Sequence, residues 1–234
     1  MNAPRRIGHL YPSGGLCEDE MPRMAPPDVR FHVTRMPFRG TSLHDDRALL
    51  QDLESHARLL ADARVELIAV NCTAATMLAG SEAVNARVTS ATGIPSVTTI
   101  EAVLAALAAT RMKRLLLVTP YPAEVVAEEI AYLQARGHEV VAAAGTPCAT
   151  PWEQGNLEPE TWIALARQLA AREADGLLLS CAGVPVAGVL ARMENILGRP
   201  VVTSNQALLW RCLRLLGVNQ PQTGFGALLE GRHG

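Results

Sequence analysis

Short apolar runs alternate with longer segments of helical periodicity along this chain. Short apolar runs bounded by turn residues are typical of buried strands in parallel sheets, whereas apolar spacings of three and four residues indicate helices. In residues 44–63, Leu49, Leu53 and Leu60 recur at helical spacing behind Ser42, a candidate cap. The pattern predicts strands at 5–11, 29–36, 114–119, 138–143, 176–180 and 200–203, a further strand that ends at Cys72, and another at Val97. It predicts helices at 44–63, 73–90, 99–110, 122–136 and 159–172, from after Pro185 to 197, and at 205–216.

The rest of the chain shows no such periodicity. A polar, proline-rich stretch covers residues 17–28, and an irregular stretch covers 145–157. The tail 219–234 is glycine-rich and is expected to be loose, apart from an apolar segment at 225–229 that could dock. Strands that alternate with helices predict parallel sheets covered by helices on both faces.

The same pattern occurs twice. The segments ELIAVNCTA (66–74) and DGLLLSCAG (175–183) each end an apolar run in a cysteine, and Cys181 follows Cys72 by 109 positions (181 − 72). RIGHLYP (6–12) matches RLLLVTP (114–120) at an offset of 108 (114 − 6), and Pro95 matches Pro200 at 105 (200 − 95). Landmarks in one order at one spacing indicate duplication.

The duplication predicts an α/β fold of two pseudo-symmetric lobes, each a parallel sheet flanked by helices. We expect residues 1–98 with 203–234 to form the N-terminal lobe and residues 99–202 to form the C-terminal lobe. Ligands of such sheets gather at the carboxyl ends of the strands, where Cys72 and Cys181 both fall. The active site is therefore expected in the cleft between the lobes, with one thiol from each half.

Composition narrows the function. With 234 residues and a hydrophobic fraction of 49%, the chain can form a large core, while a net charge of −2 and 4% aromatic residues provide neither the basic surface nor the stacking rings of a nucleic-acid or membrane partner. No apolar leader or run of about 18 apolar residues is seen, so we expect a cytoplasmic protein. Five cysteines without CxxC spacing, and six scattered histidines, favour free thiols and no metal site.

The residue types around the two cysteines suggest their chemistry. A thiol at a helix N-terminus meets unpaired N–H groups, which are expected to stabilise the thiolate and lower its pKa, and the same groups suit a carboxylate. Nearby hydroxyl groups would surround a small anion with neutral donors and without lysine, metal or cofactor. They belong to Ser13, Thr73, Thr119, Tyr121 and Ser204.

Two opposed thiols allow two reactions. One thiolate could remove a proton from carbon while the other thiol donates from the opposite face, or it could add to a double bond that rotates before elimination. A single cysteine at a strand end is more often structural, and Ser13 and Thr73 could simply cap helices. The symmetric pairing of Cys72 and Cys181 favours the catalytic interpretation.

At these residues the chain resembles the aspartate/glutamate racemase superfamily, and within it the branch of maleate cis–trans isomerases and arylmalonate decarboxylases. The resemblance runs from about Arg5 to Val218 and is carried by LLLVTPYPAEV (115–125), LLLSCAG (177–183) and GRPVVTSNQALLWRCLRLLG (198–217). It implies two pseudo-symmetric lobes, no cofactor, and contact between Tyr121 and a substrate carboxylate.

The two branches differ at the first cysteine. Decarboxylases of this kind carry glycine there and use the second cysteine to reprotonate the product, so Cys72 makes this chain more similar to the two-cysteine isomerases and racemases. Thr73 matches a threonine of the decarboxylase's carboxylate-binding hole. The turn Pro12-Ser13-Gly14-Gly15 differs from the Pro-Ser-Ser-Asn of maleate isomerases, and a second family asparagine aligns near Pro151 or Trp152, close to Asn156. Loss of both amides would remove donors for a dicarboxylate.

These observations lead to one main prediction and two alternatives. The main prediction is a cofactor-independent isomerase or racemase of a small carboxylate; the alternatives are a decarboxylase with Cys181 as proton donor and a non-catalytic carboxylate-binding module. Helices 99–110 and 205–216 could form a homo-oligomer interface or be internal. We expect Cys72 and Cys181 to be catalytic and the following residues to bind substrate: Ser13, Gly14, Gly15, Thr73, Tyr121, Ala182 and Gly183.

Overall fold

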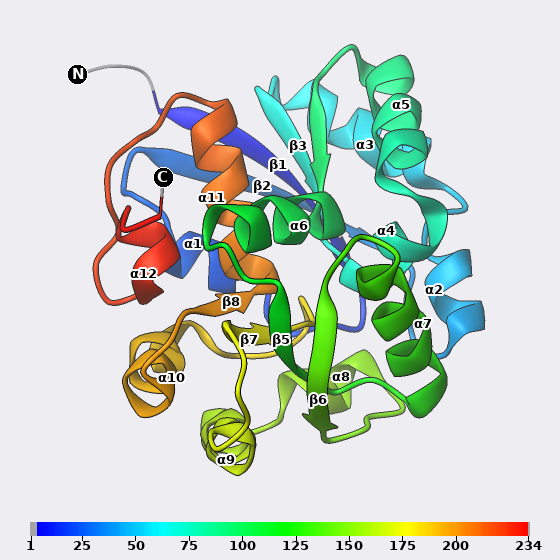
Figure 1. Ribbon diagram of the computed structural model, residues 1–234. Coiled ribbons are helices and arrows are strands. Elements are labelled where there is room, and N and C mark those ends of the chain that lie inside the picture. Colours follow the sequence, from blue (N-terminus) through cyan, green and yellow to red (C-terminus); the bar gives the residue numbers. More distant parts are fainter. Residues whose placement is uncertain (1–3, 234) are drawn as a thin grey trace.

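Two four-stranded parallel sheets form the framework of the computed structural model, which describes residues 4–233 (Figure 1). The first sheet has the order β2-β1-β3-β4 and the second β6-β5-β7-β8, so each repeats one topology and confirms the predicted α/β fold. The strands are β1 (Arg5–Pro12), β2 (Val29–Met36), β3 (Leu67–Val70), β4 (Ser96–Thr98), β5 (Arg114–Thr119), β6 (Glu139–Gly145), β7 (Gly176–Leu179) and β8 (Val201–Thr203).

The inner strands of the two sheets have matching registers. β1 pairs with β3 up to Leu10 and Val70, and β5 pairs with β7 up to Val118 and Leu179. β3 and β7 are buried along their whole length, as expected for strands covered on both faces. The chain therefore leaves each sheet at an equivalent edge, and the two predicted cysteines follow two residues after β3 and β7.

Helices cover both sheets, and two of them lie between the sheets (Figure 1). α6 and α11 pack against each other there, and a single apolar core runs from the first sheet through them into the second. Most of their apolar residues are thus buried within the chain, and Leu215 at the end of α11 is exposed. The helices are α1 (Glu20–Met24), α2 (Leu43–Ala48), α3 (Leu53–Asp62), α4 (Thr73–Ala79), α5 (Ser81–Thr92), α6 (Thr99–Ala109), α7 (Ala123–Gln134), α8 (Pro151–Gly155), α9 (Pro159–Leu169), α10 (Leu190–Leu197), α11 (Ser204–Leu215) and α12 (Gly226–Leu229), with a 3-10 turn η1 (Ala187–Val189) before α10.

Several predicted elements differ from the structure for local reasons. The single helix predicted at 73–90 is two helices, because Gly80 has a φ of +81° that breaks the first and begins the second. The helix predicted at 44–63 is also divided, into α2 and α3. The stretches at 17–28 and 145–157, predicted to be irregular, contain the short helices α1 and α8.

The end of the chain is less loose than predicted. α12 is buried along its length, and Gln206 Nε2 of α11 donates to the carbonyl oxygen of Phe225 at 2.7 Å. The lobe boundaries at 98/99 and 202/203 stay a prediction, and residues 1–3 and 234 of the predicted N-terminal lobe lie outside the described residues. Within residues 4–233, no helix has the length and apolar character needed to cross a bilayer.

Because β7 is an inner strand, its side chains hold the second sheet against its helices. Leu178→Ala removes a fully buried side chain from β7 and is expected to lower the free energy of unfolding by about 2–5 kcal/mol. Leu59→Ala, at a side chain that is 59% exposed, is the matched control and should change it by less than about 1 kcal/mol. Urea unfolding of both variants tests this difference, and equal losses would contradict it.

Candidate active site

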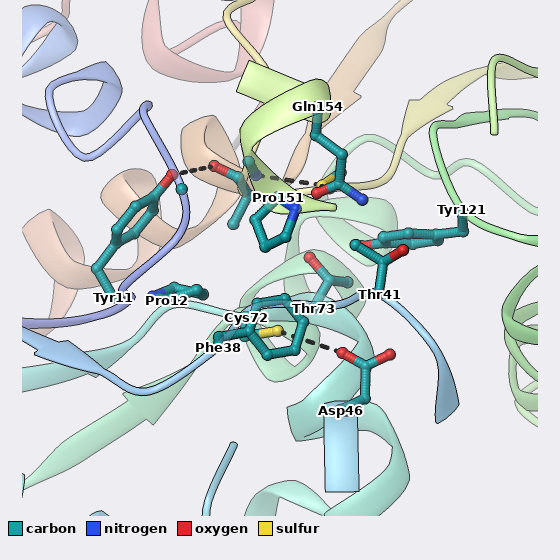
Figure 2. Close-up of a pocket in the computed structure, with 14 residues that line it drawn as sticks. Tyr11, Pro12, Phe38, Thr41, Asp46, Cys72, Thr73, Tyr121, Pro151 and Gln154 are labelled. Carbon is teal, nitrogen blue, oxygen red and sulfur yellow. Dashed lines mark hydrogen bonds between the residues drawn. The ribbon is translucent and has the colours of Figure 1, made fainter. Parts of the chain in front are cut away.

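One cavity lies where the carboxyl ends of the two sheets meet (Figure 2). Segments that are far apart in the sequence form its walls: the end of β1, the chain from Phe38 to α2, the start of α4, the turn after β5, α8, and the turn after β7. Its free cavity volume is about 20 Å³, so the side chains that line it nearly fill it in this structure. The lining residues are Tyr11, Pro12, Gly15, Phe38, Thr41, Asp46, Cys72, Thr73, Tyr121, Pro151, Gln154, Cys181, Ala182 and Gly183.

The cavity contains most of the residues predicted from the sequence. Both cysteines line it, together with Gly15, Thr73, Tyr121, Ala182 and Gly183.

Ser13 and Gly14 lie beside the cavity instead of lining it. Ser13 Oγ accepts the amide N–H of Phe38 at 3.0 Å, and the Gly14 N–H donates to the carbonyl oxygen of Phe38 at 3.1 Å. In this structure the two residues therefore hold the segment that carries the Phe38 ring into the site.

Cys72 occupies the N-cap position of α4, in an extended conformation with φ −152° and ψ 114°. Only 7% of the residue is exposed, and burial raises the pKa of its thiol well above the usual value. The nearby Asp46 carboxylate raises the pKa further, while the amides of Ala74 and Ala75 act in the opposite direction. The prediction that the helix N-terminus leaves Cys72 with a lowered pKa is therefore wrong, because desolvation outweighs the N–H groups.

Cys181 has a different setting from Cys72. It lies in a turn, and η1 begins only at Ala187, so no helix starts at this cysteine and that part of the prediction is also wrong. The Gly183 N–H donates to Cys181 Sγ at 3.2 Å, and the thiol donates to Gln154 Oε1 at 3.5 Å. Burial raises the pKa of Cys181 to about 12, and the contacts with Gly183 and the Tyr121 hydroxyl only partly offset this effect.

Two hydroxyl groups of the site retain their protons. Burial raises the pKa of Tyr121 well above its usual value, which keeps the phenol neutral and able to donate a hydrogen bond. Thr73 Oγ1 donates to Ser204 Oγ at 2.8 Å and is held at the start of α4. Thr119 Oγ1 accepts the Tyr121 N–H at 2.9 Å and so fixes the turn that carries this tyrosine.

Asp46 lines the cavity and was not predicted from the sequence. It is 3% exposed, and Cys72 Sγ lies 3.9 Å from its Oδ1 (Figure 2). Burial raises its pKa to about 7, and the adjacent Asp45 adds to the increase. A signal was present: Asp46 shares helical spacing with Leu49, Leu50 and Leu53, which places a carboxyl group on the apolar face of the predicted helix.

Gln154 was also missed, because it lies in the segment predicted to be irregular. The N-cap Thr150 and the N-terminal Pro151 start α8 there, and α8 directs the Gln154 side chain into the cavity (Figure 2). Its Oε1 accepts a hydrogen bond from the Cys181 thiol, and its buried Nε2 has no hydrogen-bond partner among the described residues. This amide is a donor available to a ligand.

Other missed lining residues come from the end of β1, the segment before α2 and the start of α8. They are Tyr11, Pro12, Phe38, Thr41 and Pro151. Tyr11 connects the lobes: its hydroxyl accepts the Cys17 N–H at 2.9 Å and donates to the carbonyl oxygen of Ala182 at 3.4 Å.

Hydrogen-bonding groups and weak acids, with no cationic side chain, make up the polar lining of the cavity. None of its 14 lining residues is a lysine, arginine or histidine, so hydrogen-bond donors must hold any anion. Across residues 4–233, no three histidine, cysteine, aspartate or glutamate side chains are grouped to hold a metal ion. The ionisable groups that face one another are two thiols, one carboxyl and two phenols.

Known proteins that are similar in sequence include maleate isomerases and an arylmalonate decarboxylase. The family model described as arylmalonate decarboxylase matches residues 8–229. A maleate isomerase of Nocardia farcinica is 30% identical over 241 residues, which cover 97% of this chain and 96% of the relative. An arylmalonate decarboxylase of Bordetella bronchiseptica is 27% identical over 232 residues and 96% of each chain.

A solved structure extends the likeness to three dimensions. The Nocardia farcinica maleate cis-trans isomerase, in a mutant with a covalently bound succinylcysteine intermediate, matches with a TM-score of 0.91 and 28% identity. The match covers 97% of this chain and 98% of that one.

Two buried carboxyl groups make the stability of the fold depend on pH. The pKa of Asp46 rises from 3.8 to about 7 on folding, and burial raises that of Glu129 from 4.5 to about 7. At these two sites the folded state binds more protons than the unfolded state between about pH 4 and pH 7, so the free energy of unfolding should fall as pH rises, by up to about 1.4 kcal/mol per pH unit for each group. Burial lowers the pKa of His9 from 6.5 to about 4, which opposes one of the two carboxyl groups over most of this window, so the net fall is that of about one group.

Asp46→Asn and Glu129→Gln should each flatten this dependence, as measured by urea unfolding at several pH values. Glu128→Gln, at the exposed neighbour of Glu129, is the control and should retain the wild-type slope. A free energy of unfolding that rises between pH 4 and pH 7 in the wild-type protein would contradict these raised pKa values.

Proposed function

This chain belongs to the arylmalonate decarboxylase family, and we propose that within it the protein is a cofactor-independent isomerase or racemase of a small carboxylate. The observation that carries the proposal is the pair of buried thiols, Cys72 and Cys181, which reach one cavity from equivalent ends of two duplicated sheets. The proposal includes membership of the wider aspartate/glutamate racemase superfamily, which the duplicated lobes support.

Neutral donors would bind the substrate carboxylate. The Tyr121 phenol and the free Nε2 of Gln154 face the cavity. The Thr73 hydroxyl, at the N-terminus of α4, donates to Ser204 Oγ in this structure and would turn from it to donate to the substrate. Donors in a site from which water is largely excluded are strong, because the local dielectric is low. They would also stabilise the enediolate that forms when charge moves from the reacting carbon onto the carboxylate.

The two thiols would then perform different steps. In isomerisation, the Cys72 thiolate adds to one carbon of the double bond and the Cys181 thiol gives its proton to the other carbon. The resulting single bond rotates, the Cys181 thiolate takes a proton back, and elimination releases the other isomer and restores the Cys72 thiolate. In racemisation, the Cys72 thiolate takes the α-proton and the Cys181 thiol donates its own proton to the opposite face. The succinylcysteine in the Nocardia farcinica relative supports covalent addition of a cysteine.

Decarboxylation is the second candidate, favoured by the family description and by the Bordetella bronchiseptica relative. In this reaction a disubstituted malonate loses carbon dioxide, and the resulting enediolate takes one proton from the Cys181 thiol. Cys72 would have no step in it, which gives the two candidates different mutational signatures.

Single substitutions of the two cysteines test the proposed function. Cys72→Ala and Cys181→Ala should each reduce turnover by about 100-fold or more, because each removes a group that moves a proton or forms a bond. Cys212→Ala is the matched control: it removes a buried thiol of α11 that does not line the cavity. Proton NMR in deuterated buffer follows maleate, both enantiomers of aspartate and glutamate, and phenylmalonate.

The same spectra separate the candidates. Growth of fumarate or loss of an α-proton signal supports an isomerase or racemase. Conversion of phenylmalonate to a deuterated arylacetate that survives Cys72→Gly supports the decarboxylase. Full activity in both Cys→Ala variants would contradict both.

A further inference from the structure

The proposed reaction needs a thiolate, yet both thiols of the resting site are protonated. Burial raises the pKa values of Cys72 and Cys181, and the nearby amides do not overcome it. A thiolate then forms only if a neighbouring group takes the proton. The contacts of the two sulfur atoms decide where such a group exists.

The two sulfurs have chemically different partners. Cys72 Sγ lies 3.9 Å from Oδ1 of Asp46, a carboxyl group that can hold a proton. Cys181 Sγ lies 3.5 Å from Oε1 of Gln154, an amide oxygen that accepts a hydrogen bond but is not basic enough to take the proton. The otherwise symmetric site is thus asymmetric in its proton acceptors.

Asp46 is held in place for this contact. It lies on α2, which Ser42 and Asp45 start with a reciprocal capping box, and α2 packs against α4, which begins at Cys72. Asp46 is 3% exposed, so bulk water does not readily replace it as the acceptor.

The charged surroundings do not neutralise Asp46. Asp45 and Arg47 flank it on α2, and Glu124 of α7 accepts the Leu43 N–H at the start of that helix. Tyr121, Cys181 and Cys72 face it across the cavity, and no lysine, arginine or histidine lines the cavity.

We propose that Asp46 is the proton acceptor that activates Cys72, an inference that rests on the proposed function. The Cys72 S–H bond breaks, its electron pair stays on sulfur, and the proton forms an O–H bond with Asp46 Oδ1. Asp46 holds this proton while the thiolate acts and returns it when the cycle ends. Total charge is conserved in the transfer, and no further reactant takes part.

The opposite prediction follows if Asp46 acts only through its charge. A carboxylate beside a thiol raises the pKa of that thiol, so its removal would make Cys72 more easily ionised. A proton acceptor has the reverse effect, because without it the buried thiol keeps its proton. The sign of the change in Cys72 reactivity therefore separates the two roles.

The test is the rate of alkylation of Cys72 by iodoacetamide between pH 6 and pH 10, with the modified residue identified by peptide mass spectrometry. In the wild-type protein, the rate should rise as Asp46 ionises and level off above about pH 7. Asp46→Asn should slow Cys72 alkylation at pH 8 by about 10- to 100-fold and leave the rate still rising at pH 10. Asp46→Glu should recover part of the wild-type rate.

Asp52→Asn is the matched control, because it removes an exposed carboxylate from the same lobe, and it should leave the profile unchanged. Circular dichroism of each variant checks that it is folded. An equal or faster rate of Cys72 alkylation in Asp46→Asn would overturn the proposal, even if turnover still depends on Cys72. Failure of the proposed function would be seen separately, as turnover that survives Cys72→Ala.

Discussion

A buried network of asparagine side chains links the turn at Cys72 to the turn at Cys181. Asn71, between β3 and Cys72, donates through Nδ2 to Asn205 Oδ1 of α11 at 2.8 Å. Asn205 in turn donates to the carbonyl oxygen of Ala182 at 3.0 Å, and Thr99 of α6 donates to Asn71 Oδ1 at 3.0 Å. An unpaired polar group in this position would cost about 1–3 kcal/mol, so the arrangement of both cysteine turns depends on the network being complete.

Contacts between the lobes also shape the turn around Cys181. Glu20 of α1 accepts the N–H groups of Val186 and Ala187 at 2.9 and 2.7 Å, although its carboxyl group is buried. The Cys17 thiol donates to the Gly183 carbonyl oxygen at 3.4 Å. α1 and the loop before it therefore hold the turn that follows the second thiol, so the shape of the cavity depends on packing between the two halves.

Desolvation dominates the electrostatics of the site. The backbone N–H groups beside each sulfur lower the pKa of the thiol. Burial raises the pKa of both thiols by more than these groups lower it. Because both thiols are protonated, an anionic substrate enters the site without an opposing thiolate. It also makes activation depend on a particular neighbour, and only Cys72 has a carboxyl group in contact.

The sequence by itself determined the α/β class, the duplication and the pair of cysteines, because strand and helix periods and repeated motifs are local properties of the chain. It also indicated Thr73, Tyr121 and the Cys181–Gly183 turn, since residues that follow parallel strands meet at one edge. The tertiary structure alone decided that Asp46 and Gln154 face the two thiols and that Ser13 and Gly14 hold Phe38 beside the cavity. Those positions depend on loops and short helices that pack between the lobes. The raised pKa values depend on how much water the packed structure excludes. No local sequence pattern encodes either property.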